Sequence, residues 1–362
     1  MNNLKQIIKQ LVPLGIIKRR NDSDFLCQYD KWLQLDKEVV WDDTCKASHI
    51  VSVQGFGYSG SGAVVDLLRE YECCNVVGYV SPIGSLTSRK EDKGEVNIMR
   101  RTGGLLQLSQ LYDEANPSSI FWDDAMMKTF IRQCGYDGLT RNENIKEIYF
   151  AFIKEITELR IKNIDGFPYN GFLSRYDDTS EIFHLRRMSK GEFINLCRLF
   201  LNTLFNQLTK EDGQLLILDQ MLADCGYNQT ILKQYIPNIK QIAVYRDPRD
   251  IYALAHSLNV SWIAHDSTDR FVKWFKSCYR GFATEMSDIL TVGFENLVNN
   301  YDHEVSRIEK YLGIDSGCHT NCFKCFNPQI SAQGVGQWRR SAIPNGDFEK
   351  IKEELSDYCY ER

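Results

Sequence analysis

A run of small residues between two apolar segments is the part of the sequence best suited to hold an anion. This glycine loop, residues 55–62, reads Gly-Phe-Gly-Tyr-Ser-Gly-Ser-Gly and lies between the apolar segment 49–54 and the amphipathic segment 63–70. Small residues let backbone N–H groups approach an anion closely, and the amino end of a following helix adds its positive dipole end. We therefore predict a strand-to-helix loop that binds a phosphate-like group.

Two common phosphate-binding loops match the glycine loop incompletely. The dinucleotide pattern Gly-x-Gly-x-x-Gly is present, but it needs an acidic residue at the end of the second strand, where this chain has Val80-Ser81-Pro82. The nucleoside-triphosphate loop needs Lys after its second glycine, where this chain has Ser61. A P-loop kinase would therefore lack the cation that faces the β and γ phosphates, and it is kept only as an alternative.

Two further candidate segments lie in the C-terminal third of the chain. The apolar segment 241–245 runs directly into Arg246-Asp247-Pro248-Arg249-Asp250. An arginine at a strand end presents a planar fork of donors that suits a terminal phosphate. Residues 333–339 read Gln-Gly-Val-Gly-Gln-Trp-Arg, a glycine-containing loop that ends in an aromatic residue and a cation.

In this order, the segments resemble the motifs of sulfotransferases that use 3′-phosphoadenosine 5′-phosphosulfate (PAPS). Residues 59–62 are similar to the family's 5′-phosphosulfate loop, residues 245–250 to its 3′-phosphate motif, and residues 333–339 to its C-terminal loop, offset by one residue. Residues 294–297 and 308–314 resemble two further stretches of the family. The resemblance covers residues 49–345, and the ordered set is more specific than any single motif.

The resemblance implies a reaction and a co-substrate site. It implies transfer of a sulfuryl group from PAPS to a hydroxyl of a small-molecule alcohol, with no metal. Because acceptor, sulfur and leaving oxygen must line up, the chain must hold both substrates in one orientation. The implied PAPS-binding residues are Tyr58, Ser59, Gly60, Ser61, Gly62, Ala63, Arg246, Ser257, Gly334, Trp338 and Arg339.

The resemblance also implies a general base that takes the acceptor proton. Cytosolic members of the family carry a His after the strand that precedes the 3′-phosphate strand. The corresponding residue here is Asp219, which is the first candidate, and Glu95 is the second. A strand-end Asp can equally cap the next helix.

The sequence departs from the family pattern at two positions. Tyr58 stands where the family's loop begins with Lys or Arg, and Arg89, Lys90, Arg100 and Arg101 are possible substitutes. The family usually has a Ser eight residues after the first Arg of the 3′-phosphate motif, where this chain has Leu254. Ser257 lies three residues, about one helical turn, further on. The departure at Tyr58 suggests an alternative, a nucleotide-binding protein of the same fold without turnover.

The elements that would position these residues alternate along the chain. Strands are expected at residues 49–54, 76–80, 214–219, 241–245 and 289–292. Helices are expected at residues 63–70, 229–236, 249–258, 267–288 and 302–312. This order predicts an α/β fold with a mostly parallel central sheet flanked by helices and a P-loop-like strand–loop–helix nucleotide site. In such sheets ligands bind beyond the carboxyl ends of the strands.

The predicted domain organisation is an N-terminal extension followed by one sulfotransferase-like domain. The extension is 1–47, of which 21–47 is polar and irregular, and the α/β domain is 48–362. A helical insertion is expected around 105–212, with helices at 143–162 and 190–208. Its many aromatic residues, among them Phe150, Phe152 and Phe183, either line a pocket for a sterol or steroid or form a helical core beside a saccharide groove.

Composition limits the partners. The chain of 362 residues has 43 Lys and Arg against 48 Asp and Glu, a net charge of −5, so no nucleic-acid partner is expected. No apolar span is long enough for a transmembrane helix. The basic, amphipathic residues 1–20 leave weak peripheral membrane contact as a minor alternative.

Cysteine usage indicates the compartment. There are 12 Cys and no signal-peptide pattern, which predicts reduced thiols and a cytoplasmic protein. Cys318, Cys322 and Cys325 lie close to His319, a combination that can bind zinc. Because Cys322-x-x-Cys325 has no second Cys-x-x-Cys to pair with it, we expect no metal site.

Overall fold

The computed structural model describes residues 25–77, 124, 127, 130–131, 142–162, 181–219, 233–260, 263–279 and 289–361. The chain divides into two compact units. We call Cys45–Arg100 together with Leu208–Arg362 the sheet unit, and Met1–Thr44 together with Arg101–Gln207 the helical unit. The predicted extension and most of the predicted insertion thus fall into one unit, while the single-domain organisation stays a prediction.

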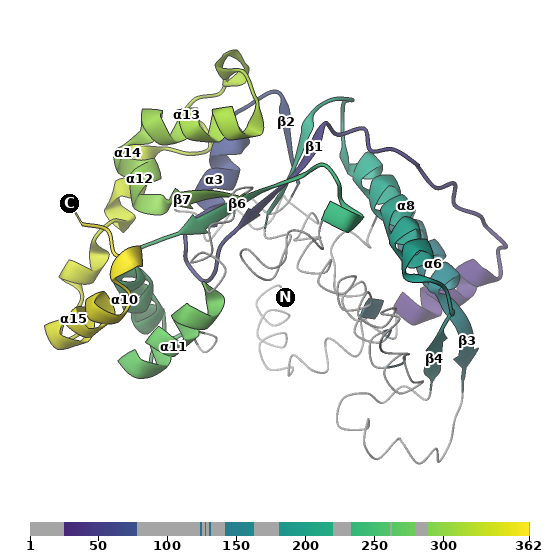
Figure 1. The fold of residues 1–362 in the computed structure, drawn as a ribbon, viewed down its shortest axis with the longest axis horizontal. Coiled ribbons are helices and arrows are strands. Elements are labelled where there is room, and N and C mark those ends of the chain that lie inside the picture. Colours follow the sequence, from purple (N-terminus) through teal and green to yellow (C-terminus); the bar gives the residue numbers. More distant parts are fainter. Residues whose placement is uncertain are drawn as a thin grey trace, which may run out of the picture. The chain divides into compact units, whose positions relative to one another are not determined.

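The sheet unit is built on five parallel strands. In sheet order they are β2 (Cys74–Val77), β5 (Leu215–Asp219), β1 (His49–Gln54), β6 (Ile239–Tyr245) and β7 (Ile289–Gly293) (Figure 1). The central strands read as apolar runs because both of their faces are covered. The predicted α/β class with a mostly parallel sheet is confirmed.

The described helices of the sheet unit form two groups. On one face, α3 (Ser61–Leu68), α12 (Phe294–Asn299) and α13 (Tyr301–Leu312) share a core with the strands, and Val64 and Leu67 lie among its fully buried residues. The short helix α14 (Pro328–Ser331) contacts α12. The second group has its own core and consists of α10 (Pro248–Leu258), α11 (Thr268–Cys278) and α15 (Asn345–Glu354) (Figure 1). Because α3 follows β1 and α10 follows β6, both helices begin at the carboxyl edge of the sheet.

Within its described residues, the sheet unit also contains four 3₁₀ turns. They are η3 (Ser316–Cys318), η4 (Ala332–Gly334), η5 (Gln337–Arg340) and η6 (Ser356–Tyr358). Between η4 and η5 the chain reverses at Gly336, whose φ of 67° is in the left-handed region that favours glycine. We call residues 333–340 the C-terminal loop.

The helical unit contains α6 (Glu143–Ile156), the antiparallel strands β3 (Thr157–Ile161) and β4 (Ile182–Leu185), and most of α8 (Lys190–Leu208). The side chain of Asn142 caps α6 by accepting hydrogen bonds from the first turn. The helix expected over 143–162 ends earlier than predicted, at Ile156, because residues 157–161 form the strand β3.

Residues 25–33 form a helix, which corrects the expectation that 21–47 is irregular. Phe25, Tyr29 and Trp32 recur at helical spacing and are buried against Phe150 of α6, with ring centroids 5.0, 5.5 and 5.9 Å away. Phe152 stacks on Phe200 of α8 at 4.4 Å. These aromatic residues belong to the core of the helical unit.

No helix in the described ranges is both long and apolar enough to cross a bilayer. The basic segment 1–20, for which peripheral membrane contact was considered, lies outside the described residues.

Candidate functional site

The glycine loop connects β1 to α3 through a tight turn. Ser59 donates its backbone N–H to the carbonyl of Phe56 at 3.0 Å. Tyr58 and Gly60 both have left-handed backbone conformations, with φ of 62° and 87°. A Cβ on Gly60 would lie 2.5 Å from the ring of Phe294, so only glycine fits there. The turn thus requires a glycine where its backbone approaches the Phe294 ring.

The hydroxyl of Ser59 is the most informative polar group of the loop. The residue is 2% exposed, and its Oγ has no hydrogen-bond partner among the residues that the structure describes. A Cβ on Gly55 would lie 1.9 Å from this Oγ, so the hydroxyl sits directly over the glycine backbone. A buried hydroxyl without a partner is costly, which makes it a donor available to a ligand.

Helix α3 begins immediately after this hydroxyl. Its N-cap, Gly60, makes no side-chain capping hydrogen bond, and its first turn contains no acidic residue. The positive end of the helix is therefore not neutralised by a carboxylate in its own first turn. Ser61, Gly62 and Ala63 form this turn.

Arg246 connects the glycine loop to the C-terminal loop. It follows β6 directly, and its guanidinium donates to the carbonyl of Tyr58 at 3.3 Å and to the carbonyl of Gly334. The guanidinium carbon lies 4.9 Å from the centre of the Phe294 ring. Its Nε is buried without a partner in the described part of the chain. Its nearest carboxylate there is that of Asp250, at 4.0 Å.

The turn between β6 and α10 holds Arg246 in place. The carboxylate of Asp247 caps α10 by accepting the N–H of Arg249 at 2.9 Å, and it also binds the Arg249 guanidinium, with one contact of 2.6 Å. The same carboxylate accepts the N–H of Tyr360 at 3.1 Å. Arg249 is thus engaged in a buried ion pair, and Pro248 at the first helical position fixes the start of α10.

Glu295 supports this turn from α12. Its Oε1 accepts the backbone N–H of Asp247 at 2.9 Å. Burial raises the pKa of Glu295 to about 7, although the N–H groups of Asp247 and of Glu295 itself favour the ionised form. The carboxyl group therefore changes charge near neutral pH.

Asp250 holds the C-terminal loop. Its carboxylate is fully buried and accepts the N–H of Gly336 at 2.7 Å and that of Trp338 at 2.9 Å. Burial raises the pKa of Asp250, and the N–H of Trp338, the charge of Arg246 and the N–H of Gly336 oppose this rise. The Trp338 ring lies 4.5 Å from the guanidinium carbon of Arg249 and 5.0 Å from that of Arg339.

The structure brings several of the predicted site residues into contact. Tyr58 and Gly334 share Arg246 as a donor, and Gly60 lies against the same Phe294 ring as Arg246. A Cβ on Gly334 would lie 3.3 Å from Nη2 of Arg246, so the loop approaches the guanidinium closely. These contacts join residues from three distant parts of the sequence.

Of the two candidate bases, Asp219 lies within the described residues and Glu95 does not. Asp219 is the last residue of β5, and its Cα pairs in register with that of Val53 in β1. Because Val53 precedes the glycine loop by two residues, the backbone of Asp219 lies at the same edge of the sheet. Glu95 and the basic residues between 89 and 101 lie outside the described residues.

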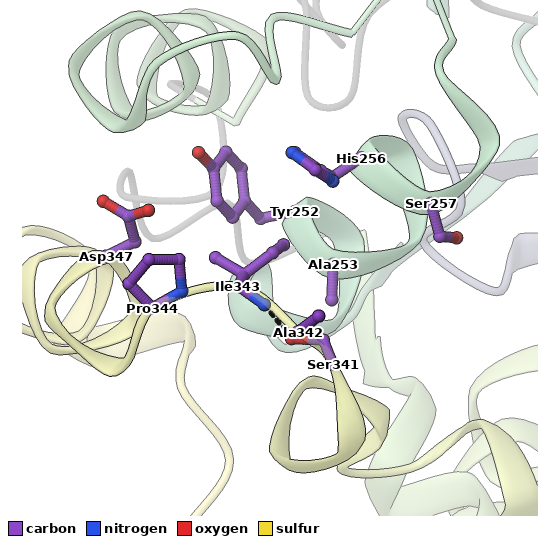
Figure 2. Close-up of a pocket in the computed structure, with 9 residues that line it drawn as sticks. All are labelled: Tyr252, Ala253, His256, Ser257, Ser341, Ala342, Ile343, Pro344 and Asp347. Carbon is purple, nitrogen blue, oxygen red and sulfur yellow. Dashed lines mark hydrogen bonds between the residues drawn. The ribbon is translucent and has the colours of Figure 1, made fainter.

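Ser257 lies at the carboxyl end of α10. It lies in the last turn of α10, roughly 14 Å along the helix axis from Pro248. Its Oγ donates to the carbonyl of Leu254 at 3.0 Å. It borders a cavity of about 320 Å³ that Tyr252 and Asp347 also line, and its hydroxyl points away from both (Figure 2). A nucleotide-binding role for Ser257 stays a prediction.

The cysteine-rich segment is anchored through His319 and Glu70. His319 pairs with the buried carboxylate of Glu70 at 2.9 Å and stacks on the ring of Tyr71. The second oxygen of Glu70 accepts the N–H groups of Cys325 and Phe326. No group of three or more metal-ligating side chains is found among the described residues.

Sequence reasoning did not assign roles to Asp250 and Glu295. Both belong to segments that carry the resemblance, Asp250 to 245–250 and Glu295 to 294–297. Their presence there was a usable signal, but their hydrogen bonds cross 86 and 48 positions of sequence.

No family model matches the chain, and no curated protein matches it. Similar solved structures include the sulfotransferase domain of the olefin synthase from Synechococcus PCC 7002. That likeness has 11% identity and a TM-score of 0.38 and covers 90% of this chain and 100% of the domain.

A sulfotransferase from Mycobacterium avium has 11% identity and a TM-score of 0.41, with 96% of this chain and 85% of that chain covered. A retinol dehydratase in complex with androsterone and inactive cofactor PAP has 12% identity and a TM-score of 0.32, covering 88% and 82%. The similar structures thus include sulfotransferases, the family that the motifs resemble.

Proposed function

We propose that this chain is a PAPS-dependent sulfotransferase that transfers a sulfuryl group to a hydroxyl of a small-molecule alcohol. The observation that carries the proposal is the pair formed by the glycine loop and Arg246. The loop offers the hydroxyl of Ser59, which has no partner among the described residues, at the start of α3, and Arg246 reaches the same loop from the neighbouring parallel strand.

The donors around this loop fit an anionic co-substrate. They comprise a buried hydroxyl, the uncapped amino end of α3 and a guanidinium whose Nε has no partner in the described ranges. All are hydrogen-bond donors or positive charges, which suits a phosphosulfate and a 3′-phosphate. When bound, PAPS supplies a sulfuryl group whose transfer forms a sulfur–oxygen bond to the acceptor and breaks the one to the 5′-phosphate.

The residues of the chain have separate roles in this proposal. Ser59 and the first turn of α3 bind the phosphosulfate, and Arg246 binds the 3′-phosphate. These donors are held in place before the reaction, so they can stabilise the negative charge that develops on the leaving phosphate in the transition state. Asp219 takes the proton of the acceptor hydroxyl, with Glu95 as the second candidate. The acceptor is a sterol or steroid alcohol or a saccharide.

One observation favours a second candidate, a nucleotide-binding protein without turnover. The loop position that carries Lys or Arg in the family is occupied by Tyr58, whose carbonyl accepts a hydrogen bond from Arg246. Without a cation there, stabilisation of the leaving oxygen must come from elsewhere.

Two measurements test the proposal in sequence. In calorimetry, 3′-phosphoadenosine 5′-phosphate (PAP) should bind more tightly than AMP, because only PAP carries the phosphate that Arg246 recognises. Equal affinities would contradict the proposal. The protein is then incubated with labelled PAPS and an extract of sterols, lipids and glycans. A sulfate gain on an alcohol, detected by mass spectrometry, supports the transferase, whereas PAP binding without such a gain favours the binding protein.

A further inference from the structure

The C-terminal loop is attached to the nucleotide-binding elements through one buried carboxylate. Asp250 accepts two backbone N–H groups of this loop, those of Gly336 and Trp338, one on each carboxylate oxygen. The carboxylate is fully buried, and water does not compete for these hydrogen bonds. Hydrogen bonds to an ionised acceptor in such surroundings are about twice as strong as neutral ones.

Arg246 adds a second attachment next to the first. It precedes Asp250 by four residues and donates to the carbonyl of Gly334, two residues before Gly336. Its other contact is the carbonyl of Tyr58 in the glycine loop. Arg246 therefore joins the C-terminal loop to the glycine loop.

We propose that Asp250 is a positioning residue that holds the C-terminal loop closed against Arg246 and the glycine loop and thereby retains the bound nucleotide. This assignment rests on the proposed function, since the nucleotide it retains is PAPS or PAP. Asp250 touches no substrate in this proposal. It acts through the backbone of Gly336 and Trp338 and through the position of Arg246.

The test uses Asp250→Asn in the full chain, because the amide keeps the volume of the carboxyl group. One N–H of the C-terminal loop then faces an NH₂ donor instead of an acceptor. Amide hydrogen exchange of residues 334–338 should accelerate about tenfold or more, while β1 and α3 exchange as in wild type. The Kd of PAP should rise about tenfold, mainly through faster dissociation. Once an acceptor has been identified, a steady-state assay should show that KM for PAPS rises by a larger factor than kcat falls.

Two further variants complete the test. Asp302→Asn makes the same chemical change at an exposed position in the first turn of α13 and should match wild type in both measurements. Gly336→Ala strains the backbone of the C-terminal loop itself, because φ of Gly336 is 67° and an added Cβ would lie 3.1 Å from the Arg339 guanidinium. It leaves the buried carboxylate in place, so it tests loop closure even if Asp250→Asn does not fold. It should change exchange and PAP dissociation in the same direction.

The outcomes separate this inference from the proposed function. Unchanged exchange at Gly336 and Trp338 in a folded Asp250→Asn variant overturns the attachment. Faster exchange with wild-type PAP affinity overturns the link to the nucleotide. If Asp250→Asn does not fold, a Gly336→Ala variant with faster exchange and unchanged PAP dissociation overturns the same link. If the wild-type chain does not bind PAP, the proposed function and the nucleotide-retaining role fail together, while exchange alone still decides whether Asp250 holds the loop.

Discussion

Arg246 is a buried cation whose hydrogen bonds in the described residues go to two carbonyl groups. Its nearest described carboxylate, that of Asp250, lies at 4.0 Å and already accepts two backbone N–H groups. A bound phosphate would add an anionic partner and engage Nε. We expect Arg246→Ala to weaken PAP binding by about 1.5–3 kcal/mol in calorimetry. Arg270→Ala, at an exposed arginine of α11, is the matched control. Wild-type affinity in Arg246→Ala would make residues 246–250 a purely structural turn.

Asp219 is expected to act on the acceptor. If it takes the acceptor proton, Asp219→Asn removes the base without removing a phosphate ligand. Turnover should fall about 10²-fold or more in a steady-state assay with PAPS and the identified acceptor, while PAP affinity stays nearly unchanged. Normal turnover would remove Asp219 from this role and make Glu95 the next residue to substitute.

The raised pKa of Glu295 predicts a pH-dependent contribution to stability. The unfolded chain ionises this carboxyl near its ordinary pKa of 4.5, but the folded chain keeps it protonated up to about pH 7. Its stabilising contribution is therefore fully present below pH 4.5 and is lost as pH rises to about 7. Glu295→Gln does not titrate and keeps an acceptor for the N–H of Asp247.

Urea unfolding of Glu295→Gln and wild type between pH 4.5 and 8 measures this effect. The variant should gain stability relative to wild type with rising pH, by about 2–4 kcal/mol over the interval. A constant difference across this range would mean that the carboxyl group is already ionised in the folded chain at acidic pH.

At the scale of elements, two glycines at the start of α3 differ in whether a side chain could replace their hydrogen. Gly60 has φ of 87°, and a Cβ there would meet the ring of Phe294, whereas a Cβ on Gly62 would meet nothing within 4 Å. Gly60→Ala should lower the free energy of unfolding by about 1–3 kcal/mol, because both the backbone and the contact are strained. Gly62→Ala should be neutral or stabilising by up to about 1 kcal/mol, since it replaces a helical glycine. Equal effects of the two substitutions in thermal or urea unfolding would contradict this description of the turn.

At the scale of the whole molecule, the proposed chemistry uses only donors and a base supplied by the chain. We expect EDTA to leave sulfotransferase activity unchanged, with dialysis against metal-free buffer as a parallel treatment. Loss of activity with EDTA that zinc restores would revive a metal role for Cys318, Cys322 and Cys325.

Much of the sheet unit follows from local patterns in the sequence. Apolar runs bounded by turn residues predicted all five strands to within a few residues, because central parallel strands are covered on both faces and show little alternation. The helix at 25–33 was missed, although Phe25, Tyr29 and Trp32 have helical spacing. Its stability depends on Phe150, more than 100 residues away, and such a contact leaves no local signal.

Residue types and local patterns were enough to find the candidate phosphate site. The loop with Ser59 and Gly60 follows β1, and Arg246 follows β6, at the carboxyl ends of parallel strands, where ligands bind. Three contacts appear only in the folded chain, namely those of Arg246 with Tyr58 and Gly334 and the ion pair of Arg249 with Asp247. The physical reason is that strand and helix periods depend on neighbouring residues. Side-chain partners across 88 or 188 positions of sequence depend on strand order and on how each turn directs the chain.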